Sequence, residues 1–196
     1  MRNAGILLGF APWIVFAVLS GPSTWEWGAL TAFVVTLVLA VPDWRRTREV
    51  NVLDVAGIAF FGVLSVLTFV LEREDLQWVE DRAQLLSSLV LTLVAVVSLA
   101  IGRPFTEYHA RQDVPREYWT SPLFRRVNVV ITAVWAAAFA LTAACDLVVL
   151  SVPGSGDLLN WVLPVLIIVA AVRFTIWYPQ HARARAGLGN DREAAS

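Results

Sequence analysis

The chain has 196 residues, of which 58% are hydrophobic and 16% charged, and its formal net charge is −1 at pH 7. Its mean hydropathy is +0.65, and the apolar residues form long blocks rather than amphipathic stripes, which excludes an ordinary soluble domain of this size. The charge balance gives no indication of nucleic-acid binding, and the single cysteine, Cys145, excludes an intramolecular disulfide.

Six apolar runs follow one another along the chain. They cover residues 4–20, 25–41, 51–71, 84–101, 127–150 and 158–178. A helix needs roughly 17 to 25 apolar residues to cross the hydrocarbon core of a bilayer, and uniform rather than alternating hydrophobicity favours helices over a β-barrel. The sequence therefore predicts an all-α fold, with a six-helix transmembrane domain in residues 1–180 and a disordered cytoplasmic tail over 181–196.

The basic residues give the predicted orientation. All 15 are arginines, and most fall before the first run or after the second, fourth and sixth runs. By the positive-inside rule, both termini and the loop between the fourth and fifth runs are expected in the cytoplasm. The acidic stretch 72–83 is expected to be an outer loop. A cleaved signal peptide is the alternative interpretation of the first run, and it stays open.

The loop from Gly102 to Arg126 is the candidate functional segment. Pro104 and Pro115 are each suited to the start of a short helix, which we expect to lie in the membrane interface. Arginine suits phosphate and carboxylate groups because its planar fork donates two parallel hydrogen bonds. The candidate ligand or partner surface consists of Arg103, Thr106, Glu107, Arg111, Trp119, Arg125, Arg126 and Asn128. The alternative is that these arginines only anchor the inner face and pair with neighbouring carboxylates.

Two charged residues, Asp54 and Arg173, lie inside apolar runs at a similar expected depth near the inner face. They are the candidate intramembrane polar pair. Alternatively, the Arg173 side chain extends toward the inner headgroups, since an unpaired charge in lipid is costly. We predict no catalytic, cofactor or metal site, because His109 has no second histidine or cysteine nearby.

Part of the chain resembles a known family. The matching features are Gly102-Arg103-Pro104 at the end of the fourth run, followed by Arg126, Asn128, Trp135 and Phe139 in and before the fifth. Over about half the chain, this pattern resembles the intracellular septation protein A family and related small bacterial membrane proteins. The string Pro104-Phe105-Thr106 with Tyr108, Ala110 and Arg111 is similar to an uncharacterised actinobacterial branch. The resemblance implies a multi-pass protein of the bacterial inner membrane with a role in the envelope or in septation, and it transfers no catalytic residues.

Three functions are compatible with these features. We expect a non-enzymatic inner-membrane scaffold whose arginine-rich loop binds anionic lipid or a membrane-protein partner, with homo-oligomers possible. The first alternative is a small transporter or channel, which requires a polar cavity joining the two faces. The second is a membrane enzyme acting on a lipid-phosphate or isoprenoid substrate, which requires a closed pocket beneath the loop. A scaffold requires only a filled interior.

Overall fold

The computed structural model describes residues 4–21, 24–152 and 158–185, and within these ranges the chain is helical with no strand. The main helices are α1 (Ala4–Leu19), α2 (Trp25–Thr47), α3 (Val52–Val70), α4 (Arg73–Ala100), α5 (Thr106–Asp113), α6 (Pro122–Ser151) and α7 (Leu163–Arg185). A short 3-10 turn, η1 (Arg116–Tyr118), precedes α6, and a π-helical turn, η2 (Leu158–Val162), precedes α7. The predicted all-α class is confirmed.

Five of the helices, α2, α3, α4, α6 and α7, are long and apolar enough to cross a membrane. The first predicted span, residues 4–20, forms α1, which has 16 residues. At a rise of about 1.5 Å per residue α1 extends about 24 Å, less than the roughly 30 Å of a typical hydrocarbon core. The architecture is that of a membrane-embedded helical protein with five helices of spanning length and one shorter apolar helix.

The largest difference from the predicted boundaries is at the start of α4. This helix begins at Arg73, so residues 73–83 are helical, and the prediction that they form a loop is wrong. Carboxylates near a helix N-terminus stabilise the helix dipole, and Val79 and Ala83 are buried against the bundle. Only Leu71 and Glu72 separate α3 from α4. Acidic composition alone therefore does not distinguish a loop from the first turns of a helix.

Other boundaries also move outward from the apolar runs. α2 continues through Pro42 to Thr47, and α7 continues to Arg185, five residues into the predicted tail. α6 begins at Pro122 because the Ser121 side chain accepts a hydrogen bond from the backbone N–H of Phe124 at 3.2 Å. Residues 186–196 of the predicted tail lie outside the described residues.

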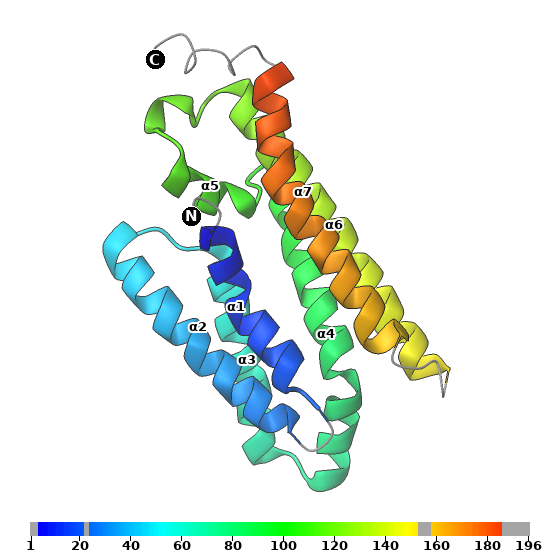
Figure 1. The fold of residues 1–196 in the computed structure, drawn as a ribbon. Coiled ribbons are helices and arrows are strands. Elements are labelled where there is room, and N and C mark those ends of the chain that lie inside the picture. The colour runs from blue at the N-terminus through cyan, green and yellow to red at the C-terminus, as the bar shows by residue number, and fades with distance from the viewer. Residues whose placement is uncertain (1–3, 22–23, 153–157, 186–196) are drawn as a thin grey trace.

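The helices form two flanks joined by α4 (Figure 1). On one flank α1 packs against α2 and α3, while on the other α7 lies along α6. α4 packs closely against α6 and also contacts α3. The start of α1, the end of α2, α5 and the end of α7 all lie at one end of the molecule, which we call the α5 end.

Aromatic rings fill the centre of the bundle. Phe10, Trp13 and Phe16 of α1 are each no more than 4% exposed. The Phe10 ring stacks on Trp135 of α6 with centroids 4.5 Å apart, and Trp13 stacks on Phe60 of α3 at 5.4 Å. α1 therefore buries one aromatic face in the bundle, while Leu8, Ile14 and Val18 on the same helix are exposed.

Candidate functional site

The segment of residues 102–121, which we call the α5 platform, closes the α5 end of the bundle (Figure 1). The chain leaves α4 at Gly102, whose φ of +70° lies in the left-handed region that glycine adopts without a steric penalty. The Ser98 hydroxyl accepts a hydrogen bond from the backbone N–H of Phe105 at 3.2 Å, which fixes the turn. The turn directs α5 back toward α1 and α6, both of which it contacts.

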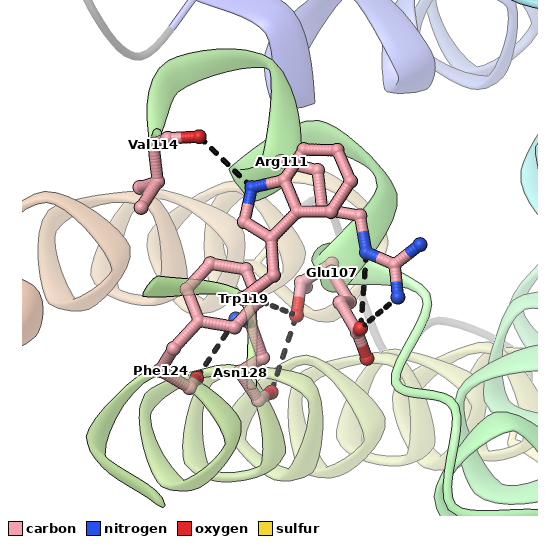
Figure 2. A network of polar contacts seen from close by, with 7 residues as sticks. Glu107, Arg111, Val114, Trp119, Phe124 and Asn128 are labelled. Carbon is pink, nitrogen blue, oxygen red and sulfur yellow. Dashed lines mark hydrogen bonds and ion pairs between the residues drawn. The ribbon is translucent and has the colours of Figure 1, made fainter. Parts of the chain in front are cut away.

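The first anchor of α5 is a buried polar cluster against α6. The Thr106 hydroxyl lies 2.8 Å from the Thr132 hydroxyl and 3.2 Å from the Asn128 side-chain oxygen. The Asn128 amide nitrogen donates to the carbonyl of Phe124 at 2.9 Å (Figure 2). Thr106, Asn128 and Thr132 are no more than 2% exposed. Thr106 and Asn128 therefore hold the platform in place and are not on its surface.

The second anchor is His109, which is 8% exposed and packs against α1 and α3. Its Nε2 lies 3.4 Å from the Asn51 amide nitrogen, and a Cβ added at Gly9 would come within 2.7 Å of the same Nε2. Burial lowers the pKa of His109 to about 4, although the nearby Asp43 carboxylate raises it. The imidazole is therefore neutral at neutral pH and fits a space that only a glycine on α1 leaves open.

The third anchor is Tyr108, which ties α5 to the end of α2. Its hydroxyl donates a hydrogen bond to the Asp43 carboxylate at 2.6 Å and lies 3.4 Å from the Thr47 hydroxyl. Burial and the hydrogen bond to Asp43 raise the pKa of Tyr108 to about 12, so the hydroxyl stays protonated. A short bond from a neutral hydroxyl to a carboxylate is among the stronger hydrogen bonds in proteins.

The outward side of the platform carries a layer of guanidinium groups around one indole. Nε and Nη2 of Arg111 donate to the same oxygen of Glu107 at 3.1 and 2.6 Å (Figure 2). The guanidinium carbon atoms of Arg111 and Arg116 lie 5.0 and 5.6 Å from the centre of the Trp119 ring. The Trp119 indole donates to the carbonyl of Val114 at 2.9 Å, which fixes the ring. Cation–π contacts of this kind hold both arginines on the platform.

Four arginines, in the α5 platform and at the start of α6, remain available to a ligand. Arg103, Arg116, Arg125 and Arg126 are exposed, and among the described residues none of them forms an ion pair with a carboxylate. A Cβ added at Gly102 would lie 3.5 Å from the guanidinium of Arg125, which places that side chain beside the turn into α5. The Arg111 charge, by contrast, already faces Glu107.

The predicted surface thus divides by position. Arg103, Arg125 and Arg126 are exposed cations, Glu107, Arg111 and Trp119 form the outward layer, and Thr106 and Asn128 are interior anchors. The sequence did not indicate the anchoring roles of Tyr108, His109 and Asp43. The available signal for His109 was its place on one helical face with Phe105 and Tyr108, but nothing local pointed to Gly9.

The predicted intramembrane pair does not form within the described chain. Asp54 lies in the first turn of α3 and lines an open pocket of about 150 Å³ between α2 and α3. Arg173 is exposed on α7, and no ion pair joins it to Asp54. The reason is the packing of α7 along α6, on the flank opposite α2 and α3 (Figure 1).

Comparisons with protein-family models, curated proteins and solved structures find no match to this chain. The resemblance to the septation protein A family therefore stays a prediction. Any functional argument depends on the geometry of the α5 platform and of the bundle beneath it.

Proposed function

We propose that the protein is a multi-pass scaffold of the bacterial inner membrane, which uses the α5 platform at the cytoplasmic face to bind the phosphate groups of anionic lipids. The observation that carries this proposal is the two-sided construction of the platform. Its inward side is fastened to α2, α3 and α6 through Tyr108, His109 and Thr106. Its outward side presents exposed guanidinium groups, including Arg116 and Arg125. A role in the envelope or in septation follows only from the family resemblance.

The filled interior supports a scaffold over a conduit. A transporter or channel needs polar groups along a passage between the two faces. In the described bundle, the space between α1, α3 and α6 holds the rings of Phe10, Trp13, Phe61, Trp135 and Phe139. Rings packed at 4.5 to 5.6 Å between centroids leave this central space to side chains.

The distribution of charge supports a cytoplasmic position for the α5 end. Arginines gather at this end, whereas Glu72, Asp75, Glu80 and Asp81 lie at the opposite end around the start of α4. Under the positive-inside rule the arginine-rich end faces the cytoplasm. The cytoplasmic leaflet is also the one with a negative surface potential, and it attracts each nearby basic residue by about 1 kcal/mol.

The experiment measures lipid retention by native mass spectrometry after release from mixed phosphatidylglycerol and phosphatidylcholine micelles. The wild type is expected to retain phosphatidylglycerol preferentially. The double variant Arg116→Gln/Arg125→Gln should lose that preference, by about fivefold in affinity for each arginine at about 1 kcal/mol. The variant Arg82→Gln, in α4 near the end opposite the platform, is the control for an arginine away from the platform.

Equal retention of phosphatidylglycerol by the wild type and the double variant would contradict lipid binding by the platform. If the double variant instead loses a co-purifying acidic protein while lipid retention is unchanged, the platform serves a protein partner. The orientation is tested separately by labelling a cysteine introduced at Glu117 in inside-out and right-side-out vesicles. Labelling only in inside-out vesicles is the expected result.

A further inference from the structure

Arg173 is a charged residue on an otherwise apolar and uncovered helix face. Leu166, Val169, Ile176 and Trp177 share this face of α7 with Arg173 at spacings of three and four residues, and all five are exposed. The opposite side of α7 rests on α6 and buries Ala171. No carboxylate of the described chain forms an ion pair with Arg173. A lipid-facing guanidinium one turn from Trp177 lacks the partner that intramembrane charges usually have.

Asp54 presents the complementary surface on the other flank. Together with Asn51 it lines the open pocket of about 150 Å³ between α2 and α3, whose walls include the exposed side chains of Val41, Trp44, Val55 and Ile58. Glu49 also lines the pocket, so its charged groups are acidic. The guanidinium of Arg48 lies 5.8 Å from the centre of the Trp44 ring, but it makes no ion pair with Asp54. We call this surface the α2–α3 groove.

The two surfaces lie on opposite flanks of one molecule (Figure 1). Asp54 is in the first turn of α3, which starts at the α5 end, and Arg173 is one turn from the interfacial pair Trp177 and Tyr178 of α7. When two copies lie side by side in a membrane with the same orientation, the α7 face of one copy can meet the α2–α3 groove of its neighbour. Because lipid tails are as apolar as leucine, the apolar residues alone do not select this contact, whereas a polar pair does.

We propose that copies of this chain assemble side by side, with the exposed face of α7 of one copy in the α2–α3 groove of the next and Arg173 paired with Asp54. The two contact surfaces differ, so the interface is heterologous. Because the two surfaces lie on opposite flanks, repeating this contact among parallel copies builds an open row, which closes into a ring only when each copy is rotated from the last about the membrane normal. This assembly does not depend on what the α5 platform binds.

Charge reversal in separately prepared variants tests the pairing. The single variants D54R and R173D should each be monomeric in lipid nanodiscs and by native mass spectrometry, with the association constant reduced at least about tenfold, the factor that 1.4 kcal/mol gives. The double variant D54R/R173D should assemble as the wild type does. A mixture of the two single variants should also assemble, because each supplies the charge that the other lacks. Rescue by mixing cannot arise from misfolding, so the test survives a loss of stability in either single variant.

Cross-linking tests the location of the contact. In a Cys145→Ala background, one tagged copy carries Val55→Cys in the α2–α3 groove and a second carries Ile176→Cys on α7. These two copies should form a mixed disulfide on oxidation. The matched control replaces Val55→Cys by Val63→Cys, an exposed position two turns further along α3, and should give little mixed product.

Three outcomes would overturn the assembly. They are a wild type that stays monomeric in lipid, a double variant or a mixture that assembles no better than the single variants, and Val55→Cys copies that link mainly to each other. The last result would mean that the α2–α3 groove meets itself in a symmetric dimer.

Discussion

α1 and α7 are both apolar helices, yet the protein uses them in opposite ways. α1 buries Phe10, Trp13 and Phe16 among other helices. Among the described residues of α7, only Ala171 is buried. In water the exposed apolar face of α7 would have to be covered by protein, whereas in a bilayer it can contact the lipid tails, which are as apolar as its side chains. The comparison teaches that hydropathy identifies both helices and cannot say which one is interior.

α1 is short, and its ends are in contact with neighbouring helices. A helix that does not reach across the bilayer must have its terminal backbone groups satisfied by protein. Near the end of α1, the Gln84 side chain of α4 donates to the carbonyl of Ala17 at 3.3 Å. Near its start, Gly9 lies against the His109 ring of α5. α1 therefore depends on its neighbours at both ends.

The largest expected effect separates the two helices directly. Phe16→Ala in α1 should lower the free energy of unfolding by about 3–5 kcal/mol, because the ring is fully buried and its loss leaves a cavity. Val169→Ala on the exposed face of α7 should change it by less than about 0.5 kcal/mol. Unfolding in mixed detergent micelles, followed by circular dichroism, measures both. Similar losses for the two variants would show that α7 is covered as closely as α1.

The second effect concerns the α5 contact at the start of α1 and depends on pH. The pKa of His109 is lowered to about 4 from an ordinary value of 6.5, so a detached α5 binds a proton that the docked helix excludes. The stabilisation is complete above about pH 6.5 and is lost progressively as the pH falls toward 4, by up to about 3 kcal/mol. The pKa of about 4 already includes the effect of the Asp43 carboxylate, which favours the charged imidazole and so keeps the pKa from falling further.

Hydrogen–deuterium exchange of the α5 amides between pH 8 and pH 4.5, corrected for intrinsic exchange, measures this effect. Protection should fall with decreasing pH in the wild type. His109→Gln is the control, since it cannot titrate, and its corrected protection should be nearly independent of pH in this range. Equal pH dependence in both proteins would assign the effect to another group.

The third effect comes from enlarging one small residue on each helix, Gly9 in α1 and Ala170 in α7. Gly9→Leu should destabilise the protein by about 1–3 kcal/mol, because even a Cβ at this position would lie 2.7 Å from the His109 ring. Ala170→Leu, on the exposed face of α7, should be tolerated. Thermal unfolding and limited proteolysis within residues 102–121 measure the outcome. A Gly9→Leu protein with wild-type protease resistance would show that α5 accommodates the added bulk.

The smallest expected effect comes from a substitution that weakens the contact of α7 with α6. The Trp135 indole donates a hydrogen bond to the Thr175 hydroxyl at 3.0 Å. Trp135→Phe also removes ring volume, so the cleaner variant is Thr175→Val, which deletes the hydroxyl and keeps the shape. Thr175→Val should lower the free energy of unfolding by about 0.6 kcal/mol, the average for such hydrogen bonds between transmembrane helices. A loss above about 2 kcal/mol in detergent unfolding would mean that α7 is held more firmly than its packing suggests.

The sequence predicted the helices well where composition and local chemistry determine them. The apolar blocks predicted the six long helices α1, α2, α3, α4, α6 and α7, and Ser121-Pro122 at the start of α6 is a cap residue followed by proline, a local signal typical of a helix start. The start of α4 was missed because acidic residues suit both an outer loop and the first turns of a helix. Packing of Val79 and Ala83, which depends on neighbouring helices, decides between the two.

The candidate site was predictable only in part. Exposed arginines follow from charge and position, so Arg103, Arg125 and Arg126 were identified. The anchors join residues far apart in the chain, since Tyr108 and Asp43 are separated by 65 positions and His109 and Asn51 by 58. No local pattern reports such a contact. The same limit explains Asp54 and Arg173, whose similar expected depth says nothing about the flank on which each one lies.

The length of α4 has a practical consequence. Its 28 residues extend about 42 Å, about 12 Å more than a hydrocarbon core of roughly 30 Å, and its acidic residues lie in its first turns, at the end opposite the α5 end. This acidic end of α4 is a rigid epitope. An antibody fragment raised against it would add mass and shape for electron cryomicroscopy while leaving the arginine-rich end untouched.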